Sequence, residues 1–167
     1  LKRKESLMGL DMYLEVRKFI PANNYKVVDG DYQREKNRDY LEVLTASNLN
    51  SLASDESVGL SVTETAIYWR KANQIHNWFI RECANGVDEC QPVYVSREKL
   101  EELLETVSDV IKTKDTSELE PASGFFFGST EIDKWYWEDL KRTKKELKTL
   151  LGKTVPHDIS FIYQASW

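Results

Sequence analysis

The segment from Tyr68 to Phe79 holds the densest set of residues in this chain that could carry chemistry. It contains two tryptophans, two cations, two asparagines and one of the two histidines of the protein. Read as a helix from about Arg70 to Cys83, it places His76 within a broad apolar face and Asn73 at the edge of that face. An unpartnered polar group in a core costs about 1–3 kcal/mol, so His76 requires a hydrogen-bond partner there. The segment predicts a polar site beside the core.

Asp139 is a second polar residue on an apolar helical face. That face belongs to a helix expected to begin after Ser129 or Thr130 and to end near Leu151, before Gly152. Its apolar members at helical spacing are Ile132, Trp135, Tyr136, Thr143, Leu147 and Leu150. If this helix packs on the first one, Asp139 can pair with His76 and leave one ring nitrogen for a ligand or for proton transfer. In that case His76 is a catalytic acid or base oriented by Asp139. The alternative is a buried structural pair without a ligand.

Arg70 and Lys71 lie where a strand is expected to pass into the first helix. Their charges suit a phosphate or a carboxylate, although taken alone a solvated helix end is the commoner explanation of such a pair. Asn73 can bond an amide or a base edge, or simply satisfy backbone groups. Trp78 projects away from the main apolar face, as Trp137 does on the later helix, and either can stack on a ligand or contact a partner.

The glycine-flanked segment from Gly124 to Ser129 leads into the later helix. It lacks the spacing of a phosphate-binding loop, and we expect no cofactor. Gly128 and Ser129 can still present backbone N–H groups to an anion near a helix N-terminus. Asp133 joins them as a candidate ligand-binding residue, although an acid also favours that end of a helix without any ligand.

Composition limits the class of protein. The chain has 167 residues, of which 41% are hydrophobic and 31% charged, with a net charge of −5. These values predict one globular domain over residues 8–167, with residues 1–7 as a leader or a remnant. The absence of a long apolar run and of a secretory signal indicates a cytoplasmic protein without a membrane span. The net charge argues against broad nucleic-acid binding. We expect Cys83 and Cys90 to be reduced and no metal to be bound.

Hydrophobic periodicity predicts an α+β fold. The expected arrangement is a small, mostly antiparallel sheet with about three to four helices packed on one face. Strands are expected at residues 8–17, 25–28, 60–69, 92–95 and 159–167. Helices are expected at residues 31–44, 70–83, 97–111 and 130–151, with a loop over residues 46–57.

Several of these segments resemble a group of small proteins encoded by bacteriophages and prophages. The resemblance rests on Met8–Leu14, on Tyr68–Asn73 with Ile75-His76 and Trp78-Phe79, on Gly124–Ser129 with Asp133–Tyr136, and on Gln164–Trp167. It covers nearly the whole chain from Met8, except residues 20–57. The group is uncharacterised, so the resemblance implies a phage context and no particular mechanism.

Three functions remain open at this point. Phage context favours an accessory protein that binds a phosphorylated or nucleotide-like small molecule, or a host or defence component, including a counter-defence role. Its pocket would use Arg70, Lys71, Asn73, His76 and the 124–133 segment. The second alternative is an enzyme on a nucleotide or phosphorylated substrate that uses His76 and Asp139. The third is a protein-binding inhibitor with an acidic, tryptophan-bearing surface.

Overall fold

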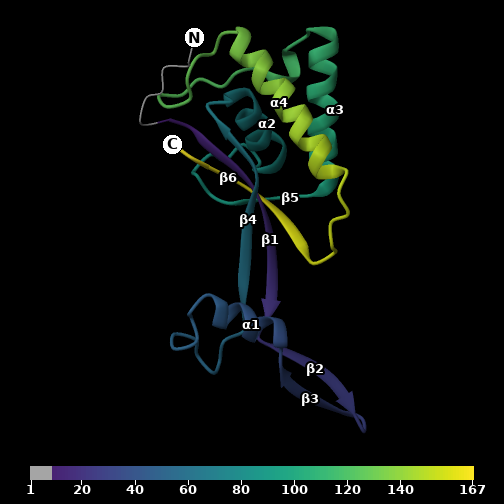
Figure 1. Ribbon diagram of the computed structural model, residues 1–167. Coiled ribbons are helices and arrows are strands. Elements are labelled where there is room, and N and C mark those ends of the chain that lie inside the picture. Colours follow the sequence, from purple (N-terminus) through teal and green to yellow (C-terminus); the bar gives the residue numbers. More distant parts are fainter. Residues whose placement is uncertain (1–8) are drawn as a thin grey trace. The chain divides into compact units, whose positions relative to one another are not determined.

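The computed structural model describes residues 9–167 (Figure 1). The described chain divides into two compact units, one formed by residues up to Val16 and from Glu64 onward, the other by Arg17–Thr63. This division is finer than the single domain expected from the sequence. Strands β1 (Asp11–Pro21) and β4 (Gly59–Arg70) each contribute residues to both units. The leader expected at residues 1–7 lies outside the described residues.

The larger unit contains a four-stranded antiparallel sheet in the order β4-β1-β6-β5. Strand β5 (Val93–Val95) pairs with β6 (Ile159–Ser166), with Val93 opposite Tyr163. Alternation along β1 buries Met12 and Leu14, as the period-two pattern predicts. The α+β class and the antiparallel sheet are therefore confirmed.

Three helices of the larger unit complete its core. They are α2 (Asn73–Cys83), α3 (Arg97–Thr113) and α4 (Lys134–Leu151), and a short 3-10 turn, η1, covers Ser117–Leu119. Ser96 caps α3, as expected, by accepting a hydrogen bond from the Lys99 N–H at 3.2 Å. Gly152 ends α4, also as expected. Within residues 9–167, no helix combines the length and the apolar character needed to cross a membrane.

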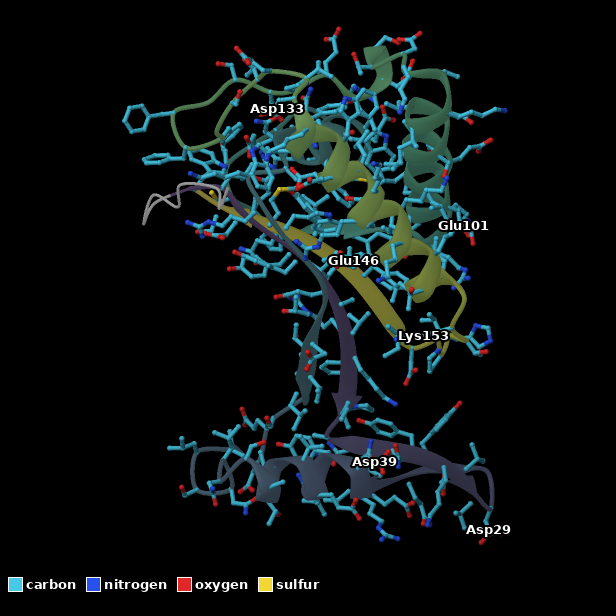
Figure 2. All side chains as sticks on the ribbon, turned by 45° about the horizontal axis from the view of Figure 1, so that its top comes forward. Asp29, Asp39, Glu101, Asp133, Glu146 and Lys153 are labelled. Carbon is cyan, nitrogen blue, oxygen red and sulfur yellow. The ribbon has the colours of Figure 1, made fainter. Side chains whose placement is uncertain are left out.

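Two helix starts differ from the sequence prediction. Strand β4 continues through Arg70, so α2 begins only at Asn73. Helix α4 begins at Lys134 rather than after Ser129 or Thr130, because the Asp133 carboxylate caps it by accepting from two backbone N–H groups (Figure 2). Both shifts lengthen the connections that precede the helices.

The core of the larger unit joins the sheet to all three helices. Its largest fully buried side chains include Trp69, Trp78, Tyr163 and Phe79. The inward face of α4 consists of Tyr136, Leu140, Thr143 and Leu147. Within this core, the Trp69 indole N–H donates to the Thr143 hydroxyl at 2.8 Å, which links β4 to α4.

The smaller unit contains a two-stranded hairpin followed by a helix. Strands β2 (Asn23–Val28) and β3 (Asp31–Lys36) are antiparallel, and α1 spans Arg38–Ala46. The prediction of a helix beginning at Asp31 is wrong for residues 31–36. Asp29 and Gly30 have φ values of 53° and 88°, and two positive values of φ define the tight turn that joins paired strands. Ile20, Ala22, Tyr40 and Leu44 form the small core of this unit.

Candidate functional site

A cavity of about 240 Å³ lies where the start of α2 meets the segment that leads into α4. Five of the ligand-binding residues predicted from the sequence line it: Lys71, Asn73, Gly128, Ser129 and Asp133. Glu131, from the predicted 124–133 segment, and Asp139, predicted as a catalytic residue, also line it, and the structure adds Gln74, Pro121, Trp135 and Tyr136. Most of the residues predicted to share a site therefore do lie around one cavity.

The backbone around Lys71 and Gly128 explains how the cavity forms. Lys71 follows the last residue of β4 with a φ of 58°, and its N–H donates to the Leu10 carbonyl at 2.8 Å. Gly128 has a φ of 91°, a conformation that glycine adopts without steric cost. A methyl group at Gly9 would overlap the Cε atom of Lys71, so glycine at that position leaves room for the lysine side chain.

Asn73 fastens the first turn of α2 to the glycine-flanked segment. Its side-chain N–H₂ donates to the carbonyls of Phe127 at 3.1 Å and Ser129 at 2.9 Å. These two bonds hold the 124–129 segment against the helix. They also show why this residue could not be assigned a role from its helical position alone, because its partners lie more than fifty residues away.

Two amide atoms in the wall have no hydrogen-bond partner in the described structure. They are Oδ1 of Asn73 and Nε2 of Gln74. Both side chains are almost fully buried, at 2% and 3% exposure. The Asn73 oxygen is an acceptor and the Gln74 nitrogen is a donor. Gln74 was not identified from the sequence, although its position directly after Asn73 was a usable signal.

The charges around the cavity are mostly negative. Among the described residues that line it, Lys71 is the cation, whereas Glu131, Asp133 and Asp139 contribute carboxylates. The Asp133 carboxylate is satisfied in part by the N–H groups of Trp135 and Tyr136, at 2.8 and 3.1 Å. This balance disfavours a ligand that carries several negative charges.

Two of the predicted ligand-binding residues lie elsewhere. Arg70 is absent from the cavity wall and pairs with the carboxylate of Asp11, at 2.8 and 3.1 Å, while the Tyr68 hydroxyl donates to the same carboxylate. Trp78 is 1% exposed and packs edge-on against Phe79, so it belongs to the core. Its projection away from the apolar stripe was misleading because the core surrounds α2 on more than one side.

The predicted pair between His76 and Asp139 is wrong. Nδ1 of His76 lies 2.7 Å from the Tyr163 hydroxyl, and Nε2 lies 3.0 Å from the Asp88 carboxylate. Both ring nitrogens are therefore engaged, and the ring is 1% exposed. Asp139 instead lines the cavity, half-buried. The sequence did indicate that His76 needs a partner, but not that the partners come from β6 and from the loop after α2.

The protonation of Tyr163 fits a structural network better than catalysis. Burial raises the pKa of its phenol well above the ordinary value, and the nearby Asp88 charge raises it further. A tyrosine that acts as a base or nucleophile needs the opposite shift. The ring of Phe127 also packs edge-on against His76, at 5.0 Å between centroids. With both nitrogens bonded and no exposed edge, His76 holds β6 against α2.

The cysteines stand apart from the cavity and are not joined to each other. Cys83 and Cys90 are both free thiols, each half-buried. Burial raises the pKa of the Cys83 thiol to about 11, so this group is protonated at neutral pH and poorly nucleophilic. In residues 9–167, no group of three or more histidine, cysteine or acidic side chains is placed to hold a metal ion.

The fold and the cavity define an α+β protein with a small polar pocket beside its sheet. Comparison of the chain with protein-family models, with curated proteins and with solved structures gives no match. The geometry of the cavity is therefore the feature that bears on function.

Proposed function

We propose that the protein binds a small polar ligand in this cavity, and that the part it recognises resembles a nucleobase. The observation that carries the proposal is the pair of buried amide atoms without partners, Asn73 Oδ1 and Gln74 Nε2. Each such atom lowers the free energy of unfolding by about 1–3 kcal/mol unless it has a hydrogen-bond partner. A ligand that brings both a donor and an acceptor relieves both costs.

The volume of the cavity and the charges around it limit the kinds of ligand that it can bind. A volume of about 240 Å³ is below the usual range for drug-sized ligands, which begins at roughly 300 Å³. It suits a base or a nucleoside rather than a dinucleotide. Among the described lining residues, the carboxylates of Glu131, Asp133 and Asp139 outnumber the single cation, Lys71, which disfavours a polyphosphate. Of the phosphorylated or nucleotide-like ligands expected from the sequence, a nucleoside or its monophosphate is favoured.

Aromatic side chains supply the remaining surface. Trp135 and Tyr136 line the cavity, and a flat heterocycle can stack on an aromatic ring. The Tyr136 hydroxyl donates to the Leu119 carbonyl at 3.0 Å, so this side chain is held in place before any ligand arrives. The resemblance to phage-encoded proteins suggests a nucleotide signal of a host defence as the biological ligand, and this belongs to the same proposal.

Thermal unfolding against a ligand panel tests the proposal. The panel contains the four common nucleosides, their 5′-monophosphates and their triphosphates, each at a range of concentrations. A ligand at about one hundred times its dissociation constant adds roughly 2.7 kcal/mol to the free energy of unfolding. We expect a nucleoside or a monophosphate to raise the midpoint and the triphosphates to do so weakly.

Gln74→Met is the diagnostic variant, because it removes the amide while preserving the length of the side chain. We expect it to fold and to lose the shift caused by the ligand. Asn77→Ala is the matched control, since Asn77 lies on the same helix outside the cavity and donates to the Glu120 carbonyl. A panel without any shift, or a shift that Gln74→Met retains, would contradict the proposal.

A further inference from the structure

We propose that one face of the β2–β3 hairpin is a docking surface for a partner protein whose own surface carries acidic groups beside an apolar patch. This site is separate from the cavity and does not depend on the proposed ligand.

The register assigns the hairpin residues to two faces. Residues directly opposite each other in an antiparallel pair share a face, and successive residues alternate. Tyr25 lies opposite Arg34, and Val27 lies opposite Tyr32. The face that carries these four residues also receives Asn23 and Lys36. We call this set the tyrosine face: Asn23, Tyr25, Val27, Tyr32, Arg34 and Lys36.

The apolar side chains of the tyrosine face are exposed. Tyr25 is 67% exposed, Val27 61% and Tyr32 81%. Among residues 23–36, only Asn23 and Val28 are even half-buried. The hairpin therefore has almost no core beneath it, and a two-stranded sheet without such support is only marginally stable. Burial of the tyrosine face by a partner would supply the support that the hairpin lacks.

The residue types match those that dominate protein interfaces. Tyrosine and arginine are enriched among the few residues that carry most of the binding energy. Here Tyr25 and Arg34 are cross-strand neighbours, and Val27 and Tyr32 form the next pair toward the turn at Asp29, which Figure 2 labels at the tip of the hairpin. Two tyrosines and an arginine, with Val27 beside them, make a compact anchor.

The charges on the two faces differ and indicate the kind of partner. The tyrosine face holds Arg34 and Lys36 and no carboxylate. The opposite face holds Lys26, Asp31 and Glu35, and Lys26 pairs with Glu35 at 2.5 Å. A second copy of this hairpin would bring the same cations together, which is unfavourable. An acidic partner surface complements them.

A nucleic acid fits the hairpin less well than a protein does. Asp29, Asp31 and Glu35 lie in the same short ribbon as the two cations of the tyrosine face, and the whole chain has a net charge of −5. Binding to a phosphate backbone gains its strength from many cations and few acids. The aromatic content alone does not replace that attraction.

Selection from a displayed library of random peptides against the intact protein tests this inference. We expect the enriched peptides to combine several aspartates or glutamates with a large apolar residue. Their affinity should fall more than tenfold for Tyr25→Ala with Tyr32→Ala, and it should fall for Arg34→Glu with Lys36→Glu. It should also weaken as salt is added. Asn24→Ala with Gln33→Ala changes the opposite face and should leave the affinity unchanged.

Several distinct outcomes would contradict the proposed docking surface. The inference is overturned if no peptide is enriched, if the enriched peptides lack carboxylates, or if the tyrosine variants bind them as well as the wild type does. Labelled oligothymidine is tested in parallel, and binding that the tyrosine variants abolish would assign the face to nucleic acid instead. Because the altered side chains are exposed, all variants should keep the wild-type thermal midpoint, which separates loss of binding from loss of folding. The test of the cavity is independent of these outcomes, because it measures whether a ligand raises the thermal midpoint and whether Gln74→Met abolishes that rise.

Discussion

The Nδ1 atom of His76 lies 2.7 Å from the hydroxyl oxygen of Tyr163, although 87 residues separate them in the chain. The other ring nitrogen lies 3.0 Å from the Asp88 carboxylate, which also accepts a hydrogen bond from the Trp167 indole at 3.3 Å. This network joins α2, the loop after it and strand β6. A polar group in the core is thus used to fix the position of the last strand.

Replacing Tyr163 with phenylalanine should destabilise the fold. The change removes the hydroxyl and leaves Nδ1 of His76 buried without a partner, which costs about 1–3 kcal/mol. Urea unfolding followed by tryptophan fluorescence measures the difference. Tyr94→Phe is the control, because Tyr94 lies on the adjacent strand β5 and is 66% exposed. Equal stabilities for the two variants would show that the network contributes nothing.

Alkaline pH should weaken the fold through the same tyrosine. Burial, together with the Asp88 charge, raises the pKa of Tyr163 in the folded state well above its ordinary value, near 10 in the unfolded chain. Above that pH the unfolded chain releases a proton that the folded protein keeps. The stabilisation is therefore fully present below about pH 10 and declines as pH rises, by at most about 1.4 kcal/mol per pH unit for one group. Burial of Tyr136, whose pKa is raised to about 12, acts in the same direction.

The free energy of unfolding, measured at intervals between neutral pH and about pH 11, gives this dependence. Tyr163→Phe should show a shallower decline than the wild type, because one of the groups whose pKa is raised in the folded state is gone. The same slope in both proteins would mean that Tyr163 ionises as easily in the folded state as in the unfolded chain.

Thr143→Val should show how much the hydrogen bond between Trp69 of β4 and Thr143 of α4 contributes to the free energy of unfolding. The variant keeps the shape of the side chain but leaves the buried Trp69 N–H without its acceptor, at a cost of about 1–3 kcal/mol. Thr149→Val is closely matched, since Thr149 lies on α4 and its hydroxyl donates to the Lys145 carbonyl as that of Thr143 donates to the Asp139 carbonyl. Only Thr143 has the tryptophan partner. Urea unfolding should separate the two variants, and similar losses would contradict a role for the indole bond.

Asp133 has two separable roles, one as a helix cap and one as a charge beside the cavity. Asp133→Ala should cost about 1 kcal/mol, because the N–H groups of Trp135 and Tyr136 lose their acceptor. Asp133→Asn keeps a capping oxygen and should cost less, while it removes the negative charge. Thermal unfolding of the two variants distinguishes these effects, and a loss as large in Asp133→Asn as in Asp133→Ala would assign the stability to the charge.

The local sequence pattern was sufficient to predict most of the helices and strands. Alternating residues predicted β1 and β6, and helical spacing together with Ser96 and Gly152 predicted α3 and the end of α4. It failed at residues 31–36, where a charged stretch has no clear period and the turn at Asp29 and Gly30 decides in favour of a strand. It also failed at the start of α4, because several polar residues before the helix could serve as its cap.

The sequence by itself determined the class of fold, the unusual polar residues and the fact that His76 requires partners, because periodicity and burial cost are local properties. It also grouped Lys71, Asn73, Gly128, Ser129 and Asp133 as candidates for one site. Only the tertiary structure decided that these five line a cavity while Arg70 and Trp78 do not. It alone paired His76 with Tyr163 and Asp88. Such partners are set by how distant elements pack, and a chain of residues offers many chemically equivalent partners until packing selects among them.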